Sequence, residues 1–168
     1  MKIIKILIIG PQRTEYQNIT EKEEIHFELI FSQSKTKEAI TIINENNLNL
    51  ILIDLHYPKF LKGLHTFEKI TRKINLPQVI ITDDLSYKVV KKVKKINPAG
   101  FINFEFLSND LFPYYIEFVI NKFKKDNLIK EDRTAESKTI QELLKEIQSS
   151  RIIINENAKE ILSLSSKF

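Results

Sequence analysis

The chain has 168 residues, of which 42% are hydrophobic and 29% charged, and its formal net charge is +4. This length suits one well-packed domain with an appendage, and the composition is that of a globular protein. The absence of cysteine excludes disulfides, thiol catalysis and cysteine-ligated zinc.

Five short apolar runs predict buried strands. The first, Ile3–Ile9, is rich in isoleucine and ends at Gly10-Pro11, as a strand covered on both faces of a parallel sheet does. It is too short to cross a bilayer, which takes about 20 apolar residues, and no cleavage-site pattern follows it. We therefore expect a cytoplasmic protein without membrane contact. The other predicted strands are Phe27–Phe31, Leu48–Leu55, Gln78–Thr82 and Gly100–Phe104.

Helices are predicted in the intervals between these strands. They cover Arg13–Glu24, which has few apolar residues, and Ser34–Asn46, Gly63–Ile74 and Tyr87–Ile96. A last helix begins after Ser108, a good capping residue, continues through Pro113, which a first turn tolerates, and ends near Lys125.

This alternation of strands and helices predicts βαβ units with right-handed crossovers, and therefore a parallel sheet with helices on both faces. Five such strands in residues 1–125 suit a doubly wound α/β domain of the flavodoxin-like strand order 2-1-3-4-5. In that fold ligands bind at the carboxyl ends of the strands. Functional side chains are therefore expected just after the strands.

A C-terminal helical extension is predicted at residues 138–168, joined to the domain by a polar linker at residues 126–137. Its apolar residues alternate at heptad-like spacings of three and four: Ile140, Leu144, Ile147, Ile154, Ala158 and Ile161. This pattern is typical of a dimerising helix. The alternatives are two helices broken near Ser149-Ser150, a helix packed on its own domain, and a connection to an output domain in a longer protein.

Five lysines lie close together in the predicted helix Tyr87–Ile96: Lys88, Lys91, Lys92, Lys94 and Lys95. Such a run attracts an acidic partner or nucleic acid, or is the solvated face of a helix. The solvated face is the simpler interpretation. Nucleic acid is not favoured, because no aromatic residues interleave with the lysines.

Three segments carry a family resemblance when taken in order. Leu50–Pro58 is a hydrophobic strand ending in Asp54, Leu76–Thr82 ends in a hydroxyl residue, and Pro98–Asn103 leads into the fifth strand. Together they resemble the receiver domain of response regulators over roughly three quarters of the chain. The resemblance implies a phospho-acceptor at Asp54, a phosphoryl-contacting hydroxyl at Thr82 and an aromatic switch residue at Phe101.

The charged residues that this family uses beside the phospho-acceptor are missing. Receivers usually end the first strand in an acidic pair that helps to hold Mg²⁺, and here Gly10 and Pro11 occupy those positions. They end the fifth strand with a lysine, and here that position is Phe104. Mg²⁺ needs several oxygen ligands, and phosphoryl transfer depends on metal and cation. We therefore expect Asp54 to be a vestigial phospho-acceptor and the domain to have no cofactor.

A rebuilt phosphorylation site is the alternative interpretation. Asp83 and Asp84 follow Thr82, and with Asp54 they are candidate Mg²⁺ ligands, although acidic loop residues are usually just solvated. His56 is a candidate local base or donor, although a lone histidine with no evident partner is more often incidental.

The last predicted helix carries more apolar side chains than one buried stripe can hold. Aromatic excess of this kind indicates an interface, and in receivers this end of the fold is the usual output and dimer face. The predicted interface consists of Phe112, Tyr115 and Phe118, with Ile147, Ile154 and Ile161 of the extension.

The leading functional hypothesis is a non-catalytic pseudo-receiver, a regulatory module of two-component signalling that acts through protein–protein contacts. Its partner is a sensor kinase, an effector or a second copy of the chain. The alternative is an active receiver that a histidine kinase phosphorylates on Asp54. A transcription factor is not favoured, because the extension is short for a DNA-binding domain and has no concentrated basic face.

Overall fold

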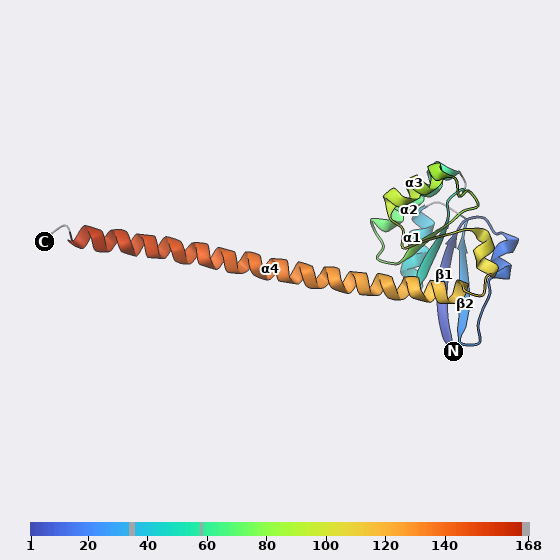
Figure 1. Ribbon diagram of the computed structural model, residues 1–168, viewed down its shortest axis with the longest axis horizontal. Coiled ribbons are helices and arrows are strands. Elements are labelled where there is room, and N and C mark those ends of the chain that lie inside the picture. The colour runs from blue at the N-terminus through green and yellow to red at the C-terminus, as the bar shows by residue number, and fades with distance from the viewer. Residues whose placement is uncertain (34–35, 58, 166–168) are drawn as a thin grey trace. The chain divides into compact units, whose positions relative to one another are not determined.

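The computed structural model describes residues 1–33, 36–57 and 59–165. The chain divides into two units, residues 1–124 and residues 125–168, and each is described by itself. The first unit is an α/β domain (Figure 1), and the described part of the second is helical. None of the helices in the described ranges is long and apolar enough to span a membrane.

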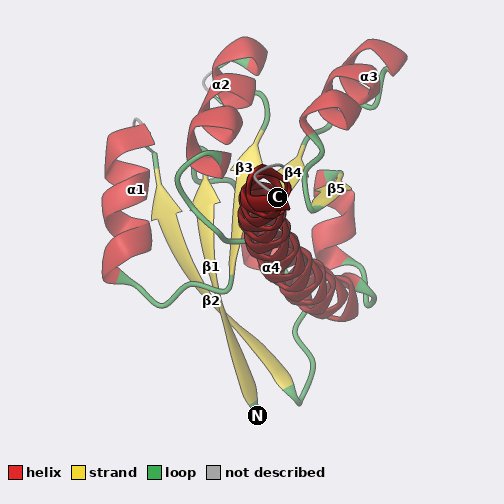
Figure 2. Ribbon diagram, turned by 90° about the vertical axis from the view of Figure 1, so that its left-hand side faces the viewer, coloured by secondary structure: helices red, strands yellow, loops and turns green. Residues whose placement is uncertain are grey.

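The sheet of the first unit has five parallel strands in the order β2-β1-β3-β4-β5 (Figure 2). This confirms the predicted doubly wound α/β fold. Strands β3 and β4 are buried at every residue, because helices cover both faces of a parallel sheet and both faces must therefore be apolar. The strands are β1 (Lys2–Ile9), β2 (Ile25–Ser32), β3 (Leu50–Asp54), β4 (Gln78–Ile81) and β5 (Gly100–Ile102).

Three helices cover one face of the sheet: α1 (Thr36–Glu45), α2 (Phe60–Thr71) and α3 (Tyr87–Ile96). Helix α2 begins before the predicted Gly63, and Gly63 itself lies against the backbone of Leu55, the residue that follows β3. A Cβ at Gly63 would meet the carbonyl oxygen of Leu55, so only glycine permits this approach. Helix α3 ends as predicted, because Asn97 adopts the left-handed conformation with φ 48° and Pro98 follows.

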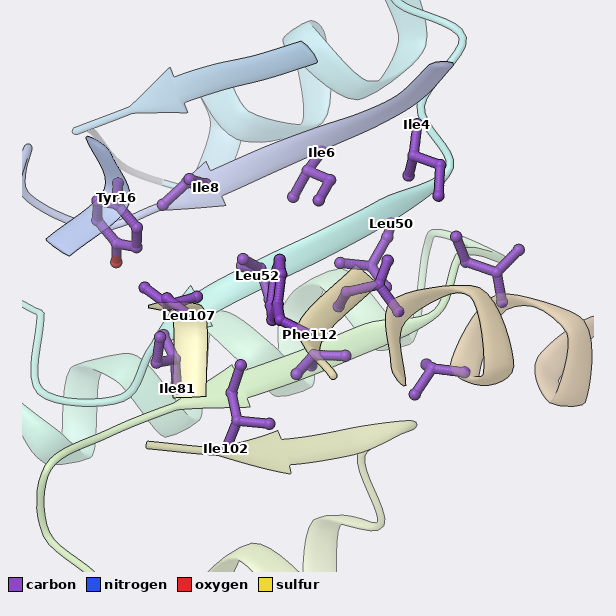
Figure 3. Packing of buried hydrophobic residues seen from close by; sticks show 14 of the residues in the cluster. Ile4, Ile6, Ile8, Tyr16, Leu50, Leu52, Ile81, Ile102, Leu107 and Phe112 are labelled. Carbon is purple, nitrogen blue, oxygen red and sulfur yellow. The ribbon is translucent and has the colours of Figure 1, made fainter. Parts of the chain in front are cut away.

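The opposite face is covered by the first turns of helix α4 (Phe112–Ser165) and by two 3₁₀ helices, η1 (Thr14–Asn18) and η2 (Phe104–Ser108). Alternate residues of the strands point into this layer, where Phe112 and Leu107 pack on them (Figure 3). The strand residues of this core are Ile4, Ile6, Ile8, Leu50, Leu52, Val79 and Ile81.

The predicted helix at Arg13–Glu24 is wrong, since only the short η1 forms there. Of its apolar residues, Tyr16 is buried and Ile19 is partly buried against the same core, too few for a helical stripe. As a result β2 is partly exposed along most of its length.

The fifth strand is shorter than predicted, because Phe104 lies in η2 and not in β5. Ser108 is the last residue of η2, where its hydroxyl donates to the carbonyl of Glu105. Asn109, three residues before α4, accepts the amide of Leu111 with its Oδ1 at 2.8 Å and so supports the turn that leads into the helix.

The second unit is helical through residues 126–137 and through Ser149-Ser150, so no break interrupts it. Five of its described apolar side chains are more than half exposed: Leu128, Ile140, Leu143, Leu144 and Ile147. The side chains of Ile154 and Ile161 lie outside the described part, as do Ser34 and Pro58.

Candidate functional site

The strand register brings three predicted site residues to the carboxyl edge of the sheet. Ile9 pairs with Ile53 and Asp54 with Ile81, so Gly10, Asp54 and Thr82 follow one another across adjacent strand ends. This is the edge at which doubly wound folds bind ligands.

The carboxylate of Asp54 is completely buried, and both of its oxygens are hydrogen-bonded. Oδ2 accepts a hydrogen bond from Nε of Arg13 at 3.2 Å and forms an ion pair with Nη2 of the same guanidinium at 3.0 Å. Oδ1 accepts the backbone amide of His56 at 2.9 Å. A buried carboxylate requires such a counter-ion, because desolvation strongly disfavours an isolated charge.

Arg13 reaches Asp54 from the short loop after β1. Its side chain is 29% exposed, and its Cζ lies 4.4 Å from the ring centroid of Phe104. Its Nη1 is 3.9 Å from Oδ2 of Asp83, a carboxylate that is itself 68% exposed. The guanidinium therefore lies within ion-pair distance of both Asp54 and Asp83 and is supported by an aromatic ring.

Phe104 occupies the position for which the family resemblance implies a lysine. Its ring is buried and packs against Tyr16, with ring centroids 5.9 Å apart. The positive charge of this site therefore comes from Arg13 after the first strand. Phe104, after the fifth strand, contributes the aromatic ring against which the guanidinium packs.

Gly10 allows β1 to approach Asp54 closely. A Cβ on Gly10 would lie 2.9 Å from the Cβ of Asp54, closer than real Cβ contacts. The hydroxyl of Tyr16 would lie 3.5 Å from that added atom, and it has no hydrogen-bond partner in the described residues. Burial, with the nearby charge of Asp54, raises the pKa of Tyr16 above its usual value.

Thr82 and His56 are joined in this site. The hydroxyl of Thr82 lies 3.0 Å from Nδ1 of His56 and accepts the backbone amide of Asp84 at 3.1 Å. The expectation that His56 lacks a partner is therefore wrong. The missing clue was the pairing of β3 with β4, which places residues after Asp54 beside Thr82.

These residues do not fit Mg²⁺. An octahedral magnesium site needs several oxygen ligands, whereas both oxygens of Asp54 are already bonded and a guanidinium lies between Asp54 and Asp83. Gly10 and Pro11 provide no carboxylate. Among the residues that the structure describes, no three acidic or histidine side chains group around a possible cation.

Comparisons with known proteins identify the fold. No protein-family model and no curated protein matches this chain in sequence. One similar structure is the signal receiver domain of a modulated diguanylate cyclase from Desulfovibrio desulfuricans, with 20% identity, TM-score 0.59, and 74% of this chain and 99% of that chain covered. Another is a response regulator from Thermotoga maritima, with 13% identity, TM-score 0.59, and coverage of 71% and 99%. The fold is that of a response-regulator receiver domain.

A further structure similar to this chain is a fusion protein that contains amino acids 181–211 of the yeast Spc42 trimeric coiled coil. Its identity is 20% and its TM-score 0.62, and the match covers 90% of this chain and 99% of that chain.

Phe101, for which the family resemblance implies the role of an aromatic switch residue, is half-buried. Its backbone amide donates to the phenolic oxygen of Tyr115 at 3.2 Å. A Cβ on Gly100 would collide with the same oxygen, so Gly100 makes room for this bond. Burial raises the pKa of Tyr115. Tyr115 thus ties α4 to β5 and is only partly available to a partner.

The predicted aromatic interface needs a correction. Phe112 is fully buried and packs against the ring of Phe27, with centroids 5.4 Å apart, so it belongs to the core. Phe118 is 62% exposed, and Tyr114 of the same helix and Leu111 just before it are exposed as well. The assignment failed at Phe112 because helical spacing gives two aromatic faces but does not say which of them meets the sheet.

Arg13 is the functional residue that sequence reasoning missed. No motif marks an arginine after Gly-Pro. The available signal was indirect: a buried Asp54 without its usual cations needs a counter-ion from another strand end, and Arg13 is the only cation between the end of β1 and Lys22.

Proposed function

We propose that this chain is a cytoplasmic pseudo-receiver, a regulatory module of two-component signalling that works by protein–protein contact and catalyses no reaction. The observation that carries the proposal is the bond between Arg13 and Asp54. A phospho-acceptor must present a free carboxylate oxygen to the phosphoryl donor and must share the new charge with a metal and a cation. Here Arg13 and the amide of His56 engage both oxygens of Asp54.

The test is phosphorylation with a small-molecule donor. The protein is incubated with Mg²⁺ and acetyl phosphate and its intact mass is measured, with Asp54→Ala as the matched control and a competent receiver in parallel. We expect the wild type and Asp54→Ala to give the same unmodified mass. A Mg²⁺-dependent phosphoryl adduct that Asp54→Ala abolishes would overturn the proposal and favour a phospho-acceptor that a histidine kinase modifies.

The rebuilt site with Asp83 is the second candidate. Its only support is the position of Asp83, whose carboxylate approaches the same guanidinium as Asp54. The same mass measurement on Asp83→Asn decides this case. If the wild type takes up a phosphoryl group and Asp83→Asn does not, Asp83 is a working ligand of the site.

For partners, we propose a second copy of the chain at the extension and a sensor kinase or effector at the domain. The isoleucines at positions 140, 147, 154 and 161 recur every seven residues, and Ile140 and Ile147 are 57% and 63% exposed. Helices in water gain most of their stability from packing an apolar face, so an isoleucine ladder of this kind needs a partner.

Residues that flank the ladder support a copy of the same chain. If the isoleucines occupy the d positions, Gln141, Gln148 and Asn155 occupy the e positions, where a coiled coil sets partner choice by charge. Neutral side chains there cause no repulsion between identical helices. Arg151 falls at an a position, where a polar residue specifies register and oligomeric state at a cost in stability.

Sedimentation velocity of the full chain tests the oligomer. We expect the wild type to sediment as a dimer or trimer, Ile147→Asp as a monomer, and the off-ladder control Ser149→Asp like the wild type. Monomers for all three proteins over the accessible concentration range would contradict this part of the proposal, whatever the outcome at Asp54.

A further inference from the structure

A groove opens beside the candidate site, between the loop after β3 and helix α3. Its volume is about 350 Å³, and it is lined by His56, Phe60, Leu61, Ser86, Val89 and the stems of two lysines, Lys88 and Lys92, with Asp84 at its rim. Pockets of this size hold a small ligand or an inserted side chain. The side chain of Leu61 is 69% exposed, so the apolar wall of the groove faces solvent.

Positive charge predominates around this groove. Helix α3 carries five lysines and no acidic residue, and none of the described residues forms an ion pair with any of them. Elsewhere in the domain, lysines do pair: Lys2 with Glu117, and Lys5 with Glu28. Like charges held on one face without counter-ions attract an acidic partner.

Two of these lysines already rest on aromatic rings. Nζ of Lys92 lies 5.0 Å from the ring centroid of Phe60, inside the groove, and Nζ of Lys91 lies 5.7 Å from that of Tyr87, which is 79% exposed. The groove therefore offers an apolar floor with cations placed at its edge. Such a surface suits a ligand that has an apolar side chain next to a carboxylate.

The acidic residue at the rim offsets only a small part of this charge. Asp84 accepts the backbone amide of Ser86 at 2.9 Å, and this bond helps to lower the pKa of Asp84. Its carboxylate thus completes the turn that leads into α3 and stays negative, but it is a single charge beside the five lysines of α3.

We propose that this groove binds an acidic segment of a partner protein, with one apolar side chain inserted against Phe60, Leu61 and Val89 and with carboxylates paired to Lys88 and Lys92. This inference goes beyond the proposed function, because it holds whether or not Asp54 accepts a phosphoryl group. A protein segment fits better than a lipid surface or a nucleic acid. The groove is concave and admits a single side chain, whereas a membrane needs a broad convex apolar face and a nucleic acid needs a series of free aromatic rings.

The groove and the strand-end site share one residue. The ring of His56 lies 5.6 Å from that of Phe60 in the groove, and its Nδ1 bonds to Thr82 beside Asp54. An occupant of the groove would therefore alter the environment of Thr82, and this gives the binding event a readout inside the domain.

The experiment selects ligands for the full chain from a displayed library of random peptides. We expect the enriched peptides to combine several acidic residues with one aromatic or aliphatic residue. The best of them is then synthesised with a fluorescent label, together with a version in which serine replaces the apolar residue, and its affinity is measured by anisotropy.

Two double variants of α3 provide matched controls with equal changes in charge. Lys88→Glu with Lys92→Glu alters the groove, and Lys94→Glu with Lys95→Glu alters exposed positions of the same helix outside it. We expect the first pair to weaken binding at least about tenfold and the second about twofold, since distant exposed charges are screened. Leu61→Ser should weaken binding without affecting the fold, and the backbone amide signal of Thr82 should shift when the peptide binds.

Several results would overturn the inference. One is enrichment without acidic residues, or no enrichment at all. Another is equal loss of affinity in the two double variants, which would mean that the lysines act only as a diffuse charge. A third is binding to vesicles that contain phosphatidylserine with no measurable binding to the selected peptide, which would assign the surface to a membrane.

Discussion

The guanidinium of Arg13 lies 4.4 Å from the centre of the Phe104 ring while it donates to the buried carboxylate of Asp54. Cation, aromatic ring and anion thus form one connected group at the strand ends. At two places where the family resemblance implies charged residues, this chain has Gly10-Pro11, which lead into the loop that carries Arg13, and the aromatic ring of Phe104. The site is organised around the ion pair of Arg13 and Asp54.

We expect Arg13→Ala to lower the free energy of unfolding by about 3 kcal/mol at neutral pH, because it leaves a buried carboxylate without its partner. Urea denaturation gives this value, and Lys22→Ala is the control, since Lys22 pairs with the 83% exposed Asp110. In an Asp54→Asn background the cost of Arg13→Ala should shrink to about 1 kcal/mol or less. Strictly additive effects would show that the two residues are not coupled.

Restoring the acidic pair should not restore a magnesium site. We expect Gly10→Asp to be destabilised, because its Cβ would come within 2.9 Å of the Cβ of Asp54. The double variant Gly10→Asp, Pro11→Asp should show no rise in melting temperature with Mg²⁺ while Arg13 holds Asp54. Scanning calorimetry with and without Mg²⁺ measures this, and a clear stabilisation of the double variant would contradict the prediction.

Tyr16 should make the domain sensitive to alkali. Its folded-state pKa lies above the ordinary tyrosine value of 10.0, first because the hydroxyl is buried and second because Asp54 is negative. A raised pKa means that the contribution of Tyr16 to stability is complete below about pH 10 and declines as the pH rises above it, because the unfolded chain ionises first. The stability of the wild type relative to Tyr16→Phe should therefore decrease as the pH rises above about 10.

At neutral pH the two proteins should differ by no more than about 1 kcal/mol, since the hydroxyl has no partner among the described residues. The measurement is denaturant unfolding across the pH range. If the free energies of unfolding of the wild type and Tyr16→Phe change in parallel up to pH 11, the raised pKa of Tyr16 is refuted.

Two phenylalanines of α4 should respond in opposite ways to truncation. Phe112→Ala should cost about 3–5 kcal/mol, because it leaves a cavity in the core. Phe118→Ala should change stability by less than about 0.5 kcal/mol, since the side chain is exposed. Urea unfolding separates the two, and a large loss in Phe118→Ala would mean that this side chain is packed in the folded protein.

The fold could be predicted because each buried strand is a continuous apolar run, and a chain that alternates such runs with helices has few possible topologies. The segment Arg13–Glu24 was mispredicted because the alternation rule demands a helix there, although the residues supply too few apolar side chains to pack one. Tertiary packing through Tyr16 decides the local structure, and spacing along the chain does not reveal it.

The sequence predicts where the candidate site lies, but it does not predict which side chains bond to one another there. Asp54 and Thr82 end apolar runs, so the topology alone brings them together. The bonds from Arg13 and His56 come from loops, whose conformation depends on the close approach of Gly10 and on the ring of Phe104. Hydrophobic periodicity does not predict the conformation of a loop. The only signal for Arg13 in the sequence is that a buried Asp54 needs a cation to neutralise it.

The ion pair between Asp54 and Arg13 has a consequence for the timing of a signal, because under the proposed function no covalent modification of Asp54 records it. Under the proposed function, nothing is added to Asp54 that a phosphatase must later remove, so a signal passing through this domain has no lifetime of its own. The response would follow the amounts of the protein and of its partners at each moment. Its speed would then be limited by synthesis, degradation and dissociation, and a mutation that altered protein abundance would act on the signal as strongly as one at the strand ends.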